Sequence, residues 1–185
     1  MDDISYNDII PDLVLNPVDS VGQHQSSLCE EPIPFPTDSI STVYLDLNQD
    51  GINDYSFTYE TYYEWVSASS PCANHNSILN VVGLIDGNEI CVANEDMDEV
   101  SVFQDGDPID RSQLFANSAV IYRDQAFAFL YFGGFSDEGC IGVKLSSGEL
   151  GWIKLDFQQN LFLCYIKEFA INKNVLLEIR AGQMQ

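Results

Sequence analysis

An acidic loop at residues 46–54 has the residue types and the spacing that could do chemistry. It reads DLNQDGIND, which fits the opening positions of a calcium-binding loop of the form Dx[DN]x[DN]Gxx[DE]. The expected ligands are the side chains of Asp46, Asn48, Asp50 and Asp54 and the backbone carbonyl of Ile52. Calcium accepts about six to eight oxygen ligands, whereas magnesium requires stricter octahedral geometry and keeps several waters. The spacing therefore predicts a Ca²⁺ site, with Gly51 at the sharp turn and the Ile52 side chain turned into the core.

The loop lacks the last ligand of an EF-hand. Phe57 occupies the position of the bidentate glutamate, and the flanking residues alternate as strands do instead of forming helices. The site would therefore borrow a ligand from another acidic segment, for which residues 94–99 and 105–110 are the candidates. The alternative is a hairpin turn rich in Asp and Asn that binds no metal.

Signals for catalysis are weaker. Cys72 and His75 stand close together, but a zinc site would need two further ligands that the spacing does not supply. The segment GFSDEG is not the nucleophile turn of a serine hydrolase, because Glu138 stands where that motif has glycine. A glycosidase needs only two carboxylates, and the sequence cannot nominate that pair among 29 acids.

The negative charge is concentrated in the first part of the chain. The net charge of -22 arises from 29 acids and 7 bases, and no Lys or Arg precedes Arg111. Phosphate recognition needs clusters of Lys and Arg, so this balance argues against nucleic acid and anionic membranes as partners. The longest nearly apolar run, residues 126–135, is too short to insert across a bilayer. The opening MDDISYND has neither the basic nor the apolar region of an export signal.

Short runs of alternating residues predict the fold. From Ser39 onward, apolar and polar residues alternate with a period of two, and turn residues such as Asp86-Gly87-Asn88 separate the runs. The pattern predicts an all-β fold, an antiparallel, jelly-roll-like β-sandwich over residues 39–185. Residues 1–38 hold five of the 7 prolines. They are expected to form an extended, Pro-rich N-terminal segment that packs poorly or lies along the edge of the domain, with Ile33 and Phe35 as anchors.

Residues 140–169 are expected to form a consecutive antiparallel meander. Cys140 and Cys164 would then lie on strands separated by the middle strand. Neighbouring strands are about 4.8 Å apart, so the two Cα atoms would be about 10 Å apart, too far for a disulfide.

The late segments GCIGVKLSSGELGWIKLDF and IKEFAINKNVLLEIRAGQ form an ordered set with the acidic loop. This set resembles the secreted β proteins of Bacteroidetes and of bacteria with PEP-CTERM sorting systems. The matching segments are Asp46–Tyr55, Ile141–Leu145, Gly151–Leu155, Ile166–Ala170 and Ala181–Gly182. The resemblance implies an exported all-β protein and carries no catalytic residues. The five cysteines, and the lack of a sorting helix after Gly182, depart from the pattern and leave the mode of anchoring open.

These observations favour a secreted or cell-surface protein that is stabilised by calcium and has no catalytic activity. Tyr62, Tyr63 and Trp65 could stack on the sugar rings of a polysaccharide or cell-surface glycan, or could pack in the core. The alternatives are a polysaccharide hydrolase with a carboxylate pair and a purely structural envelope or matrix protein.

Overall fold

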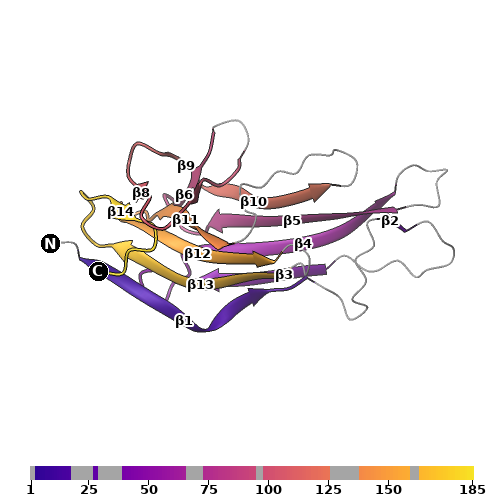
Figure 1. Cartoon of the computed structure of the whole chain (residues 1–185), viewed down its shortest axis with the longest axis horizontal. Coiled ribbons are helices and arrows are strands. Elements are labelled where there is room, and N and C mark those ends of the chain that lie inside the picture. The colour runs from indigo at the N-terminus through magenta and orange to yellow at the C-terminus, as the bar shows by residue number, and fades with distance from the viewer. Residues whose placement is uncertain are drawn as a thin grey trace.

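In the computed structural model, two large antiparallel sheets pack face to face, and a small two-stranded sheet accompanies them (Figure 1). The structure describes residues 3–17, 27–28, 39–65, 73–94, 98–125, 138–158 and 163–185. Within these ranges every regular element is a strand, which confirms the expected all-β sandwich. No helix in the described ranges is long and apolar enough to cross a membrane.

The smaller sheet has the strand order β10-β5-β4-β3, with β2 paired to β5. Its strands are β2 (Ser27–Leu28), β3 (Ser39–Leu45), β4 (Tyr55–Trp65), β5 (Ala73–Gly83) and β10 (Ser118–Gln125). The alternation seen in the sequence sets which face is buried. Tyr55, Phe57 and Tyr59 point into the core and are 0% exposed, while Ser56 and Thr58 between them face outward.

The larger sheet has the order β1-β13-β12-β11-β6-β9, and β7 also pairs with β11. Its strands are β1 (Ile4–Leu15), β6 (Glu89–Val92), β7 (Val102–Phe103), β9 (Leu114–Ala116), β11 (Glu138–Lys144), β12 (Leu150–Gln158) and β13 (Leu163–Asn172). The consecutive antiparallel pairing of β11, β12 and β13 confirms the predicted meander.

The start of the chain contributes an edge strand. Residues 4–15 are extended, as expected, but they pair with β13 as β1. Leu15 at the end of this strand is 0% exposed and belongs to the main core, so β1 is part of the sandwich. The expected anchors Ile33 and Phe35 lie outside the described residues.

A main core lies between the two sheets, and a second cluster covers part of the outer face of the larger sheet. The main core joins residues such as Phe57 and Val81 of the smaller sheet to Ile153 of the larger sheet. The second cluster surrounds Trp152, which is 0% exposed and donates its indole N–H to the Gln183 carbonyl at 3.2 Å. The short strands β8 (Pro108–Ile109) and β14 (Ile179–Arg180) pair with each other, and Ile109 and Ile179 belong to this second cluster.

The three cysteines that the structure describes are free thiols. Cys140 lies opposite Lys154 and Cys164 lies opposite Phe157, so the two cysteines flank β12 from different sides. Cys91, Cys140 and Cys164 are each 0% exposed and none forms a disulfide. Burial raises the pKa of each of these thiols to about 12, so each is a neutral thiol at physiological pH.

We predict that these three thiols resist alkylation until the protein unfolds. Iodoacetamide reacts with the thiolate, and both the raised pKa and burial suppress that species in the native state. Mass mapping after treatment with and without denaturant should show modification of Cys91, Cys140 and Cys164 only in denaturant. Recovery of a peptide linked through Cys140 and Cys164 would contradict the strand arrangement.

Candidate functional site

The loop between β3 and β4 folds into a tight turn over residues 46–54. Gln49 and Gly51 have positive φ values of 61° and 91°, so the backbone reverses through the left-handed region at both residues. A Cβ at position 51 would meet no atom within 4 Å, so the glycine is favoured by its φ and not by lack of space.

The side-chain oxygens of this loop gather around its own backbone. Asp46 Oδ1 and Asn48 Oδ1 both accept the N–H of Asp50, at 3.2 and 2.9 Å. Asp46 Oδ2 accepts the N–H of Gly51 at 2.8 Å, and Asp50 Oδ1 accepts the N–H of Ile52 at 2.8 Å. Two of the expected ligands therefore meet at one nitrogen, and the carboxylate of Asp46 lies inside the turn.

Asp54 has a different environment from the other acids of the loop. Its side chain is 1% exposed, and Oδ2 accepts the N–H groups of Leu47 and Asn48 at 2.8 and 3.3 Å. Its other oxygen accepts a hydrogen bond from the Asn88 amide at 3.1 Å. This carboxylate is therefore already held by three donors, and it anchors the loop to the body of the protein.

The Ile52 side chain is 59% exposed, so the expectation that it turns into the core is wrong. The core residues of this hairpin are Leu47 before the turn, at 1% exposure, and Tyr55 after it, at 0%. The turn between them projects from the sandwich, which leaves Ile52 at its tip. Its backbone carbonyl remains the group expected to bind a cation.

The segments expected to lend a further ligand make other contacts. In residues 105–110, Asp107 Oδ2 accepts the N–H of Gln104 at 2.8 Å, and Gly106 N–H bonds to the Ala181 carbonyl at 2.9 Å. Residues 94–99 lie partly outside the described ranges. Across the described ranges, no group of three or more His, Cys, Asp or Glu side chains is arranged to hold a metal ion. The side-chain oxygens gathered in the loop are those of Asp46, Asn48 and Asp50, and each accepts a backbone N–H of the same turn.

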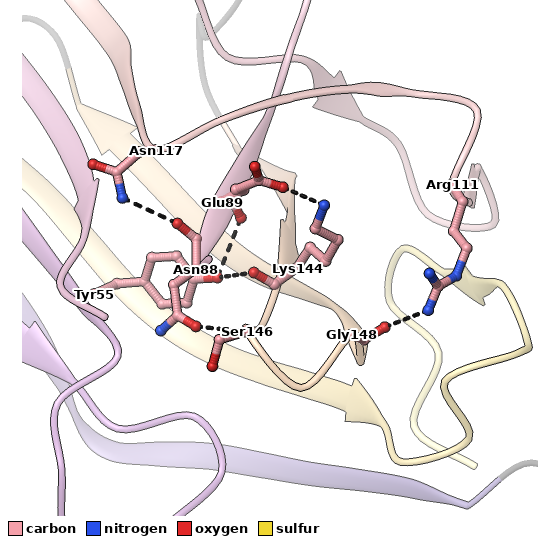
Figure 2. A network of polar contacts seen from close by, with 8 residues as sticks. All are labelled: Tyr55, Asn88, Glu89, Arg111, Asn117, Lys144, Ser146 and Gly148. Atoms are coloured by element: carbon pink, nitrogen blue, oxygen red, sulfur yellow. Dashed lines mark hydrogen bonds and ion pairs between the residues drawn. The ribbon is translucent and has the colours of Figure 1, made fainter. Parts of the chain in front are cut away.

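Behind the loop, the fully buried Asn88 joins its own turn to three others through its side chain and its backbone carbonyl, and Figure 2 shows its contacts with Ser146 and Asn117. Its amide N–H₂ donates to both the backbone carbonyl and Oδ1 of Asp54, each at 3.1 Å. Its side-chain oxygen accepts the N–H of Ser146 at 2.7 Å, and its backbone carbonyl accepts the Asn117 amide at 3.2 Å. A Cβ at Gly83 would lie 2.3 Å from the Asn88 carbonyl oxygen, so this close approach requires glycine there.

Further polar contacts lie around Asn88. Tyr55 donates its hydroxyl proton to the carbonyls of Lys144 and Glu89, at 2.8 and 3.2 Å, which ties β4 to the β6–β11 pair (Figure 2). Burial, and then the nearby Asp54 carboxylate, raise the pKa of Tyr55, so its hydroxyl keeps the proton that it donates. Lys144 and Glu89 form an ion pair beside it. Arg111 donates to the Gly148 carbonyl at 2.8 Å and so holds the β11–β12 turn.

Sequence reasoning found Asn88 only as a turn residue. The Asp86-Gly87-Asn88 pattern marks a hairpin, and Gly87 has the expected positive φ of 89°. The pattern contains no indication that the third residue is buried, because its partners come from three other turns.

We predict that Asn88→Ala costs about 2–4 kcal/mol of unfolding free energy, because it removes the Asn88 bonds to the buried Oδ1 and carbonyl of Asp54 and to the Ser146 N–H, and the carbonyl keeps only its bond from Leu84. Urea denaturation of the variant and of the native protein measures this loss. Asn53→Ala, at an exposed position of the neighbouring loop, is the matched control and should change the free energy little. Equal stabilities for the two variants would contradict a central role for Asn88.

If the protein were a glycosidase, one of its catalytic carboxyl groups would need a raised pKa. Asp124 has this property: burial raises its pKa, and a hydrogen bond with Tyr122 acts in the opposite direction. It lies opposite the buried Ser77 on β5, next to the buried Leu79–Tyr122 pair. Its pKa is therefore raised by burial and not by a second carboxylate, which gives no support to a catalytic pair at this position.

We predict that Asp124→Asn stabilises the protein at neutral pH. Above the raised pKa, the half-buried carboxylate is charged in the folded state and costs stability. Below the ordinary value of 3.8 it is protonated in both states, and the cost vanishes. Urea denaturation over a pH series should show the advantage of the variant declining as the pH falls through this range. A variant less stable than the native protein at neutral pH would show that the bond to Tyr122 outweighs burial.

The remaining candidate residues divide into two groups. Tyr62 is half-buried on β4. The structure does not describe the side chains of Tyr63, Trp65, Cys72 and His75.

No protein-family model, curated protein or solved structure matches this chain.

Proposed function

We propose that this protein is an exported, calcium-stabilised β-sandwich that serves as a cell-surface or glycan-binding module and performs no catalysis. One observation carries the calcium part. The oxygens of Asp46, Asn48 and Asp50 crowd into a single turn. Where the structure is described, every ion pair involves acids outside that turn.

Crowded carboxylates favour a cation. Asp46, Asp50 and Asp54 carry three negative charges within nine residues, and local N–H groups offset only part of their repulsion. A divalent ion with oxygen ligands would remove that repulsion and fix the turn between β3 and β4.

The ligands have unequal roles in this proposal. Asp46, Asn48, Asp50 and the Ile52 carbonyl bind the ion directly, and water completes its shell. Asp54 reaches the ion only through a water, because its two oxygens already accept three hydrogen bonds. Such a site would be weak, in the range of extracellular modules with Kd about 10⁻⁴–10⁻³ M.

The surface part of the proposal rests on motifs and on aromatic side chains. The ordered motifs of the acidic loop and the late strands resemble those of secreted β proteins. Tyr44 is 56% exposed and lies opposite Ser56 of β4. Because side chains alternate along a strand, Ser56 and Tyr62 point to the same face of the sheet, so Tyr44 and Tyr62 share that outer face. Two tyrosines on one outer face provide rings on which sugars could stack.

We predict that calcium raises the melting temperature. If free Ca²⁺ exceeds its Kd about a hundredfold, the folded state gains about 2.7 kcal/mol. For a chain of this size that corresponds to roughly 5–11 °C. The measurement is thermal unfolding in EDTA, in CaCl₂ and in MgCl₂, with the larger shift expected for calcium.

Two variants separate a bound ion from a general salt effect. Asp50→Ala should remove most of the shift, because Asp50 is a central ligand on an exposed turn. Asp86→Ala removes an equally exposed acid from the neighbouring β5–β6 turn and should keep the shift. Equal melting temperatures in EDTA and CaCl₂, with no heat of Ca²⁺ binding by calorimetry, would return the loop to a plain turn rich in Asp and Asn.

A further inference from the structure

In the described part of the chain, the two large sheets end in four strands, and three of these carry features that block pairing with another strand. The edge strand β9 has only 3 residues. The edge of β10 is occupied at Val120, whose N–H bonds to the Asp98 carbonyl at 2.6 Å. The edge strand β1 contains Asp8, Pro11 and Asp12, and its pairing is interrupted between Asp8 and Leu13. Charge, proline and irregularity are the usual means of protecting an edge.

The fourth edge, β3, has none of these features. Its sequence SISTVYL contains no charged residue, no proline and no glycine, and it pairs in perfect register with β4 over all 7 residues. Among the described residues, β4 is the one strand that pairs with β3, although the end of β1 lies close to it. Ile40 and Tyr44 on this strand are 62% and 56% exposed.

The backbone of β3 is oriented for pairing. The Leu45 carbonyl accepts the N–H of Asp54 across the hairpin, so the backbone groups of Leu45 point toward β4. Because these directions alternate along an antiparallel strand, the backbone groups of Ile40, Thr42 and Tyr44 point away from β4, toward the side of β3 where the described part of the chain places no paired strand. The same three residues face outward with their side chains, whereas Ser41 between them accepts the N–H of Asn16 from β1's end.

We propose that β3 pairs with β3 of a second copy of this chain, antiparallel, around a two-fold axis at Thr42. This register sets the exposed Ile40 of each copy opposite the exposed Tyr44 of the other, and Thr42 opposite itself. Aliphatic–aromatic and Thr–Thr pairs are favourable across antiparallel strands, and Thr42 already makes a 3.2 Å contact with Thr58 on β4. The strand is therefore self-complementary, as a two-fold interface requires.

The charge of the chain sets the conditions for this dimer. Each copy carries a net charge of -22, so the two copies repel each other. The contact itself contains no charge, since β3 has none. Added salt screens the repulsion and leaves the backbone bonds and apolar pairs in place, so the dimer should strengthen as ionic strength rises.

A charge-swap experiment tests the register. In sedimentation equilibrium, the native protein should show a reversible monomer–dimer equilibrium. The double variant Ile40→Glu/Tyr44→Glu places like charges opposite each other and should weaken the dimer about tenfold or more. Ile40→Lys/Tyr44→Glu places opposite charges there and should restore most of it. Ile10→Glu, at an 84% exposed position on the β1 edge, is the control and should not change the equilibrium.

A cross-linking experiment tests the axis without relying on affinity. Thr42→Cys should form a covalent dimer on mild oxidation, because the two new thiols face each other across the axis. Thr58→Cys faces the same way one strand further in and should not. A native protein of monomer mass at every concentration and salt level would overturn the proposal. So would a dimer that resists the Ile40→Glu/Tyr44→Glu change, or equal cross-linking of the two cysteine variants.

Discussion

The buried amide of Asn88 is the contact on which the arrangement of one end of the sandwich depends. Apolar packing between two sheets is strong but has little directional preference, so it does not determine where the turns lie. Asn88 supplies direction, because its donors and acceptors are all used and each partner belongs to a different turn. A buried polar group of this kind stabilises only when it is fully satisfied. The glycine at position 83 and the buried carboxylate of Asp54 are consequences of that requirement.

Two of the few basic residues lie beside acids of the larger sheet. Lys154 bonds to Glu138 at 2.8 Å and lies 3.5 Å from Glu168, and Lys167 lies 3.1 Å from Asp156, so these bases neutralise acids on the larger sheet. The acids of the β3–β4 loop receive no such partner within the described part of the chain. The excess negative charge therefore persists at that turn.

Local patterns predicted what local physics determines. The alternation of residues 140–169 predicted the meander, and the spacing of Asp46 and Asn48 predicted oxygens that converge in one turn. The pairing of β1 with β13 joins segments far apart in the chain, and no period of the sequence encodes a partner. The burial of Asp54 likewise depends on a contact between segments far apart in the chain. Its position in the motif is that of a ligand, but its environment is set by Asn88, more than thirty residues away.

The outer layer on the larger sheet has a consequence for the order of folding. β8 and β14 pair across a long stretch of chain, and the indole N–H of Trp152 donates to the Gln183 carbonyl near the end of the chain. Such non-local contacts form after the local hairpins, because the entropy of closing a long loop must be overcome first. During synthesis, the meander of β11, β12 and β13 can form while Trp152 is still open to water. The second cluster, to which Trp152 belongs, is thus complete only after Ile179 and Ala181 have been made, although its other members precede them in the chain.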